Sequence, residues 1–209
     1  MGDADTDPDE HTEPDGYTVT ECRRCSTLVE SRSRIVNGVG PADADVLFVG
    51  EAPGASEDAR GEPFVGRSGT VLDDALEAAG LDRSEIRITN CVRCRPPENR
   101  NPATAELANC RGYLEAEIAQ VDPAVIVTLG KVPGEHLLDR SLAVTKETGT
   151  VEMVRFDPDA SPRRVLICLH PAATLYDRSQ EAAFFETVRE AARMAGASTD
   201  GGQRGLGEF

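Results

Sequence analysis

Short apolar runs constrain the fold of this chain more than any other feature of its sequence. Residues 124–129 and 165–169 have no polar face, and residues 44–49 form a third apolar run. Runs of this kind are typical of parallel strands that are covered on both faces of a sheet. A further strand is predicted over residues 86–89. The sequence therefore predicts four central strands.

The segments that connect these strands are predicted to be helices. Apolar residues recur at helical spacing in residues 68–79, and Gly80 follows as a stop signal. Further helices are predicted over residues 104–120, 130–138 and 180–194. Residues 150–155 form a candidate strand at the sheet edge. The alternation of strand and helix predicts an α/β fold, with three α/β/α layers and a central four-stranded, mostly parallel sheet.

One folded domain is expected, over residues 19–197. Residues 1–18 are rich in Asp, Glu, Pro and Gly, and residues 198–209 are rich in Gly, so both ends are predicted to be disordered. The chain contains no apolar run long enough to cross a membrane and no pattern of a secretory signal. We therefore expect a cytoplasmic protein.

The charge balance is strongly acidic and almost free of lysine. The net charge is −15, with 37 Asp and Glu against 22 basic residues, of which only Lys131 and Lys146 are lysines. This composition predicts adaptation to high salt, as in a haloarchaeon. Acidity normally argues against a DNA partner. In concentrated salt counterion release contributes little, so net charge does not exclude DNA here.

Polar side chains stand where three predicted strands end. Asn90 directly follows residues 86–89, and His170 directly follows residues 165–169. Glu51 is separated from residues 44–49 by Gly50 alone. In an open parallel sheet, ligands bind just outside the carboxyl ends of the strands. We therefore expect Glu51, Asn90 and His170 to meet in one crevice.

Two Cys-x-x-Cys pairs point to a metal centre. The pairs are Cys22 with Cys25 and Cys91 with Cys94. Disulfides are rare in a cytoplasmic chain. One interpretation joins both pairs into a structural zinc site. A second treats Cys22 and Cys25 as a redox pair or as inert thiols, although such redox pairs normally follow a strand at a helix start.

An iron–sulfur cluster is the other interpretation of these cysteines. Such clusters are held by four thiolates at widely varying spacing. The candidate ligands are Cys22, Cys25, Cys94 and Cys110. Cys91 and Cys168 are then small residues of the core.

Five motifs in order resemble a known family. They are Gly-Glu-Ala-Pro-Gly at 50–54, Pro-Phe-Val-Gly at 63–66, Thr-Asn at 89–90, Cys-Arg-Pro-Pro at 94–97 with Asn-Arg at 99–100, and His-Pro-Ala-Ala at 170–173. Together they resemble the family-four uracil-DNA glycosylases, the iron–sulfur members of the uracil glycosylase superfamily. No phosphate loop or dinucleotide fingerprint is present to favour a nucleotide-binding metabolic enzyme.

The resemblance implies a monofunctional DNA glycosylase that hydrolyses the N-glycosidic bond of deoxyuridine and leaves an abasic site for base excision repair. It implies that Phe64 stacks on uracil, that Asn90 reads the polar edge of the base, and that His170 faces the uracil O2. The residues implied to line the pocket floor and to help place the water are Gly50, Glu51 and Ala52.

The resemblance also implies a 4Fe-4S cluster on Cys22, Cys25, Cys94 and Cys110, which favours the cluster over zinc. The implied partner is uracil-containing DNA, single- or double-stranded. A sliding clamp is a candidate partner, and a monomer is expected. Members of this family commonly have an arginine shortly after the His-Pro motif. In this chain that arginine is replaced near Tyr176, and Arg178 follows two residues later. The rival class is a nucleic-acid-binding module without glycosylase activity.

Overall fold

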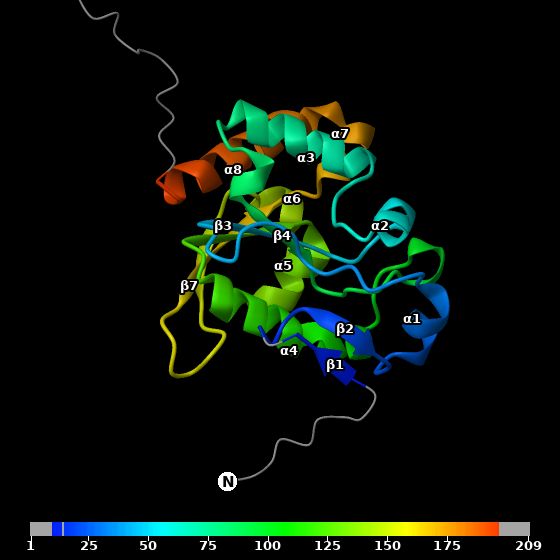
Figure 1. Cartoon of the computed structure of the whole chain (residues 1–209). Coiled ribbons are helices and arrows are strands. Elements are labelled where there is room, and N and C mark those ends of the chain that lie inside the picture. Colours follow the sequence, from blue (N-terminus) through cyan, green and yellow to red (C-terminus); the bar gives the residue numbers. More distant parts are fainter. Residues whose placement is uncertain (1–9, 14, 197–209) are drawn as a thin grey trace, which may run out of the picture.

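A computed structural model describes residues 10–13 and 15–196 and shows a sheet between two helical layers (Figure 1). Its five strands are ordered β4-β3-β5-β7-β6. They span Val46–Gly50 (β3), Arg87–Asn90 (β4), Val125–Leu129 (β5), Val151–Val154 (β6) and Arg163–Cys168 (β7). The predicted four parallel strands are confirmed, but the sheet has a fifth, because β6 pairs antiparallel with β7 at the edge.

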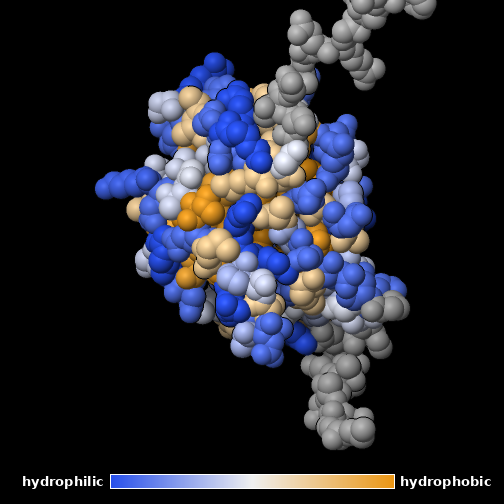
Figure 2. All heavy atoms as spheres, turned by 90° about the vertical axis from the view of Figure 1, so that its left-hand side faces the viewer, coloured by the Kyte–Doolittle hydropathy of each residue, from blue (hydrophilic) through white to orange (hydrophobic). Residues whose placement is uncertain are grey.

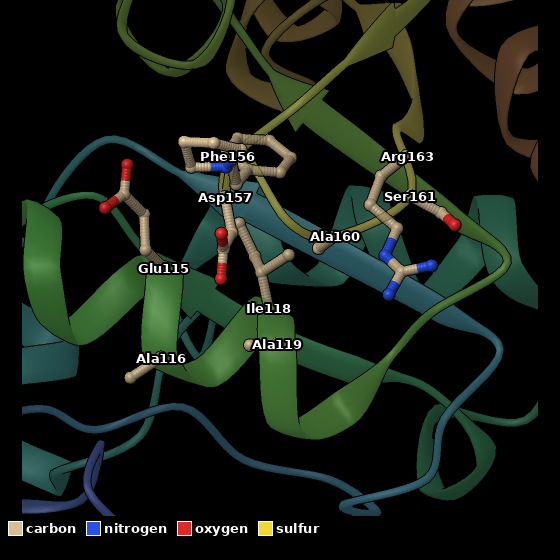
Figure 3. Close-up of a pocket in the computed structure, with 10 residues that line it drawn as sticks. Glu115, Ala116, Ile118, Ala119, Phe156, Asp157, Ala160, Ser161 and Arg163 are labelled. Atoms are coloured by element: carbon tan, nitrogen blue, oxygen red, sulfur yellow. The ribbon is translucent and has the colours of Figure 1, made fainter.

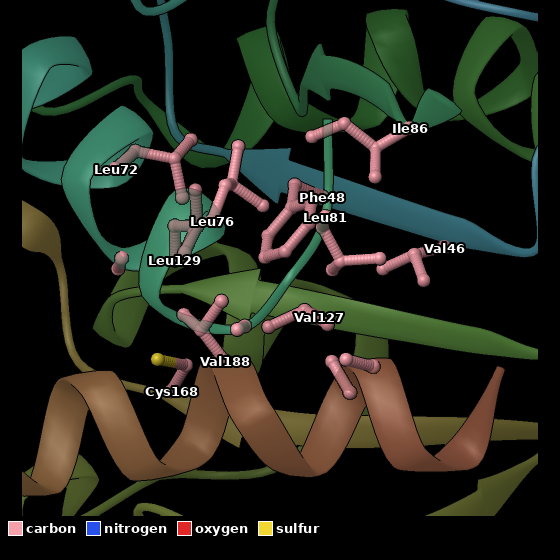
Figure 4. Close-up of a cluster of buried hydrophobic side chains, with 14 of the residues drawn as sticks. Val46, Phe48, Leu72, Leu76, Leu81, Ile86, Val127, Leu129, Cys168 and Val188 are labelled. Carbon is pink, nitrogen blue, oxygen red and sulfur yellow. The ribbon is translucent and has the colours of Figure 1, made fainter. Parts of the chain in front are cut away.

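Alternate residues of the central strands face opposite helical layers. Val46 and Phe48 of β3 pack toward α3 (Arg67–Ala78) and α8 (Glu181–Met194). In Figure 4, Val188 of α8 lies opposite Val127 and Cys168. Cys168 is fully buried, which confirms its prediction as a core residue. This layer covers the upper face of the sheet in Figure 1.

The second helical layer packs on the opposite face of the sheet. It contains α4 (Thr104–Val121) and α5 (Lys131–Leu138). Leu47 and Val49 of β3 pack with α4 and α5 side chains, and Cys91 is buried in the same cluster, as predicted for a small core residue. The four predicted helices are confirmed to within one residue at each end. The sequence favours Thr104 as the N-cap of α4, but Thr104 is the first helical residue of this helix and Ala103 stands at the cap position.

Short elements join these layers. They are α1 (Ser26–Ser31), α2 (Ala55–Arg60), α6 (Val144–Glu147), α7 (Pro171–Tyr176) and the 3-10 turns Arg83–Glu85, Pro97–Asn99 and Arg178–Gln180. Each is too short to carry a helical periodicity of its own, so the sequence did not predict them. No helix among the described residues is long and apolar enough to cross a membrane.

The N-terminal region contains a strand that the sequence predicted as disorder. Strand β1 (Glu10–Thr12) pairs antiparallel with β2 (Val19–Cys22). Between them, Asp15 accepts hydrogen bonds from the amides of Tyr17 and Thr18 at 2.9 and 2.7 Å. The turn thus satisfies polar groups locally, which composition does not reveal. Of the positions predicted to be disordered, residues 1–9, 14 and 198–209 lie outside the described residues.

Hydrophilic residues cover most of the face shown in Figure 2, and a smaller group of hydrophobic residues lies near its centre. The edge strand β6 carries two exposed apolar side chains, Val151 and Met153. Exposed apolar residues of this kind are normal on a soluble surface.

One buried carboxylate joins α4 to the start of β4 and to the loop that follows this strand. Glu117 is fully buried and accepts from Arg87 Nε at 2.7 Å and from Arg93 Nη2 at 2.8 Å. The two guanidinium groups also donate to backbone oxygens of Gly40 and Tyr17, both at 2.6 Å. A buried charge is tolerated when it is paired and hydrogen-bonded in this way.

Replacing Glu117 with Ala is expected to lower the free energy of unfolding by about 3–5 kcal/mol, because two buried arginines lose their counter-charge. Glu115→Ala on the same helix removes only a partly exposed pair with Arg111 and should cost about 1 kcal/mol or less. Urea unfolding of both variants measures the difference. Equal losses would contradict a special role for Glu117.

Candidate active site

A pocket of about 250 Å³ opens at the carboxyl ends of the strands. It is lined by Glu51, Ala52, Gly54, Glu57, Phe64, Ser68, Asn90, Asn99 and His170. Glu51 follows β3, Asn90 ends β4 and His170 lies two residues past β7. The structure therefore brings together the three polar residues expected to meet, and adds Ala52 and Phe64 from the same set of predicted site residues.

Gly50 packs behind the pocket wall. A Cβ atom at this position would collide with Asn90 Oδ1 and with the Phe64 ring. The glycine therefore allows the amide and the aromatic ring to lie side by side at the end of β3. Asn90 is only 3% exposed, so its amide has little freedom to turn away from the pocket.

The backbone around Phe64 is held in an unusual conformation. Phe64 has φ 54°, in the left-handed region that side chains rarely adopt. Arg83 donates to the carbonyl oxygens of Pro63 at 2.8 Å and Phe64 at 3.0 Å. Gly69 leaves room for the Phe64 carbonyl, where a Cβ would collide. These contacts offset the strain and keep the ring at the pocket.

The geometry of His170 defines its tautomer. Its Nδ1 accepts from the Ala172 amide at 3.1 Å, so in the neutral ring the hydrogen is on Nε2. The ring lies 5.9 Å from the Phe64 ring, centroid to centroid. Burial lowers the pKa of His170, and the nearby charge of Glu57 opposes this shift. His170 is therefore a neutral hydrogen-bond donor at neutral pH.

Two carboxylates stand at the pocket with different surroundings. Glu51 is half-buried, and burial raises its pKa. Glu57, on α2, accepts from the Gly66 amide at 3.2 Å. This bond ties α2 to the N-terminus of α3. Burial thus gives Glu51 a greater tendency to bind a proton than an exposed carboxylate has.

The sequence did not predict Gly54, Glu57, Ser68 or Asn99 as pocket residues. Asn99 reaches the pocket through a loop in which Glu98 and Asn99 both have positive φ, 54° and 55°. Arg95 Nε holds the Asn99 side chain with a hydrogen bond of 2.8 Å. The motif at 94–100 was the sequence signal that could have identified Asn99. It placed this residue in the family pattern but gave it no role in the pocket. Glu57 lies on a helix too short to show periodicity.

The four candidate ligand cysteines lie close to one another. Cys25, Cys94 and Cys110 pack in one cluster, and Cys22 lies in the neighbouring one. The charges of Cys22 and Cys25 affect the pKa of both Cys94 and Cys110. Burial raises the pKa of Cys110 to about 12. Thiolates at these positions therefore require a stabilising partner.

Two of these sulfurs have a side-chain hydrogen-bond donor. Arg32 Nη1 lies 2.8 Å from Cys94 Sγ, and Asn109 Nδ2 lies 3.2 Å from Cys25 Sγ. Within the described parts of the chain, no group of three or more His, Cys, Asp or Glu residues is arranged to hold a metal ion. A four-iron cluster separates its thiolates more widely than a single ion does. Four neighbouring cysteines, two of which have side-chain hydrogen-bond donors at their sulfurs, fit that larger group.

A second pocket, of about 450 Å³, lies between α4 and the segment that precedes β7. Figure 3 shows Phe156 of that segment, Arg163 at the start of β7, and Ile118 and Ala119 of α4 around it. It contains none of the residues predicted to act. Since β7 begins at Arg163, this pocket lies toward the opposite ends of the strands.

The fold and the pocket define an α/β domain that binds a ligand at the carboxyl ends of its strands. Residues 37–193, more than half of the chain, match the family model of the uracil DNA glycosylase superfamily. The chain belongs to the uracil DNA glycosylase superfamily.

Relatives of two types resemble this chain. The Type-4 uracil-DNA glycosylase of Archaeoglobus fulgidus is 37% identical over 163 residues, which cover 76% of this chain and 80% of the relative. That of Thermotoga maritima is 37% identical over 165 residues, covering 78% and 82%. The Type-5 uracil-DNA glycosylase of Thermus thermophilus is 30% identical over 212 residues, covering 86% and 96%.

We predict that His170 titrates below its ordinary pKa of 6.5. The unfolded imidazole takes up a proton first, so the contribution of His170 to stability is complete above pH 6.5 and is lost as pH falls through the lowered value. An NMR titration of the ring protons, assigned with a His170→Asn variant, measures this. A pKa above 6.5 would contradict the neutral tautomer.

Proposed function

We propose that this protein is a uracil-DNA glycosylase. It hydrolyses the bond between uracil N1 and deoxyribose C1′, releases uracil and leaves an abasic site, which begins base excision repair. The observation that carries this proposal is the shared pocket of Phe64, Asn90 and His170, in which an aromatic ring, an amide and an imidazole donor surround space for one base. The similarity to Type-4 uracil-DNA glycosylases supports it.

The Phe64 ring holds the base, and the Asn90 amide selects it. A base inside a duplex is unreachable, so the nucleotide must be flipped out to enter the pocket. Stacking on an aromatic ring stabilises any flipped base by about 1–3 kcal/mol, which Phe64 supplies. Stacking does not discriminate between bases. The Asn90 amide offers both a donor and an acceptor, which match uracil O4 and N3–H and mismatch cytosine.

Bond cleavage depends on charge that develops on the leaving base. As the glycosidic bond breaks, negative charge grows on uracil O2 and the sugar becomes oxocarbenium-like. His170 Nε2–H is the donor for that oxygen, because Nδ1 is engaged by the Ala172 amide. A donor aimed at a developing anion contributes about 3–4 kcal/mol. The neutral ring donates a hydrogen bond and transfers no proton.

Glu51 acts on the other side of the reacting carbon. Its half-buried carboxylate, whose pKa is raised by burial, accepts a proton from the attacking water. Its negative charge also stabilises the positive charge on the sugar. Gly50 and Ala52 place this carboxylate next to Asn90 and shape the floor of the pocket.

The resident cofactor that we propose is a 4Fe-4S cluster, held by Cys22, Cys25, Cys94 and Cys110. When bound, it supplies a covalent cross-link between distant chain segments. The ligand cysteines lie on three separate segments, which are the region of Cys22, the loop after Asn90 and α4, so a bound cluster would join these segments. The support is the closeness of these four cysteines to one another, with hydrogen-bond donors at the sulfurs of Cys25 and Cys94.

DNA contacts are proposed for the end of α7. Tyr176 is 92% exposed and Leu175 is 41% exposed, on the helix that begins directly after His170. An exposed aromatic ring next to the pocket suits stacking on unpaired bases, a contact that salt screens little. The expectations of a cytoplasmic monomer, of adaptation to high salt and of a sliding-clamp partner stay predictions.

The first experiment separates chemistry from binding. A uracil-containing oligonucleotide is incubated in molar salt with anaerobically purified protein, under single-turnover conditions. His170→Ala should lower the cleavage rate by roughly a hundredfold to a thousandfold and leave DNA affinity nearly unchanged. Tyr176→Ala should show the reverse, a weaker affinity with a nearly normal rate at saturating protein.

His136→Gln serves as the control, since it removes a histidine on α5 that does not line the pocket. Failure of the wild-type protein to release uracil, despite a retained cluster, would overturn the proposal in favour of a DNA-binding module. Equal losses of rate and affinity in His170→Ala would contradict the assigned role of His170.

Asn90→Asp is expected to weaken discrimination against cytosine. A protonated or water-bridged carboxyl group no longer presents the fixed donor and acceptor pair of the amide. The ratio of cleavage rates on matched uracil and cytosine oligonucleotides should fall by roughly tenfold or more, the scale of one lost polar contact of about 1.4 kcal/mol. An unchanged ratio would show that Asn90 does not select the base.

A further inference from the structure

Arg32 lies between two of the segments that carry the candidate ligand cysteines. It follows α1 directly, as the C-cap residue of that helix. Its Nη1 donates to Cys94 Sγ at 2.8 Å, and its Nη2 donates to the backbone oxygen of Cys22 at 2.7 Å. One guanidinium group therefore contacts both the loop after β4 and the end of β2, which are far apart in sequence.

The planar guanidinium group suits this position. Its nitrogens form a rigid fork, so two bonds can be made at once with little loss of side-chain freedom. The charge is permanent, and hydrogen bonds from a cation to a thiolate are stronger than those from a neutral donor. Asn109 provides such a neutral donor at Cys25, with a longer distance of 3.2 Å. Cys110 accepts from the Arg93 backbone.

We propose that Arg32 is a positioning residue for the iron–sulfur cluster, which it retains by bridging Cys94 to the Cys22 segment and makes easier to reduce through its charge. The inference rests on the cofactor assigned above. Hydrogen bonds to cluster sulfurs and nearby charge set reduction potentials, since a cation stabilises the more negative, reduced form. The bridge also opposes separation of two ligand segments, the step that would release the cluster.

Two substitutions separate the bridge from the charge. Arg32→Gln removes the charge and the fork. Arg32→Lys keeps the charge on a single nitrogen centre and loses the fixed bidentate geometry. The lysine variant should therefore release iron faster than the wild type while keeping a nearly normal reduction potential. The glutamine variant should change both properties.

The measurements use the full chain purified without oxygen. Iron and sulfide content is determined first, then the reduction potential by an electrochemical titration followed by absorbance, then the rate of iron release to a chelator. Loss of a ligand-supporting contact typically weakens metal binding about 10–100-fold, so release from Arg32→Gln should accelerate on this scale. The reduction potential of Arg32→Gln should be lower than that of the wild type by about 59 mV, which for a one-electron couple favours the oxidised form tenfold.

Arg189→Gln is the matched control. It removes the same charge from an exposed site on α8, where Arg189 pairs with Glu186 at 3.2 Å. It should leave both the potential and the release rate unchanged. A shift as large as that of Arg32→Gln would show a general charge effect and would overturn the proposal.

Failure of the cofactor assignment and failure of this inference give different results. Wild-type protein without iron and sulfide would refute the cluster itself. A loaded Arg32→Gln protein with wild-type potential and release rate would refute the role of Arg32. If Arg32→Gln does not fold, Arg32→Lys decides: faster iron release at an unchanged thermal midpoint supports the bridge, and wild-type release overturns it.

Discussion

The buried ion network around Glu117 connects the pocket to the cysteines. Glu117 lies on α4 and neutralises Arg87 of β4 and Arg93 of the following loop. Asn90, at the pocket, lies between these two arginines in sequence, and Cys110 lies on the same helix as Glu117. A buried charge requires close partners with good geometry. The position of one carboxylate therefore constrains both the Asn90 amide at the pocket and Cys110, a candidate cluster ligand.

The segment from Asn90 to Cys110 runs from the pocket to the cysteines and back. It leaves the pocket at Asn90, reaches the sulfurs at Cys94, returns to the pocket at Asn99 and enters α4. Such a loop has few apolar side chains with which to fix its conformation. A cluster and its supporting arginine would supply that rigidity. This gives a physical reason for the proposed cluster, to which no step of bond cleavage is assigned.

Regular elements were predictable because their signals are local. The helix at residues 104–120 shows its periodicity within its own sequence, and the structure ends it one residue later. The meeting of Glu51, Asn90 and His170 also followed from sequence, since parallel strands end at one edge of a sheet. Strand β1 was missed because its stability comes from pairing with β2 and from the Asp15 turn, and polar composition alone indicates disorder.

The sequence by itself determined the α/β alternation, the strand-end residues of the pocket and the four candidate cysteine ligands. Tertiary structure decided which further polar side chains join them. Glu57 and Asn99 line the pocket, Arg32 contacts Cys94, and Glu117 meets two arginines, all through contacts with other elements. The free energy of burying a polar or charged group depends on its partners, and those partners become neighbours only when the chain has folded.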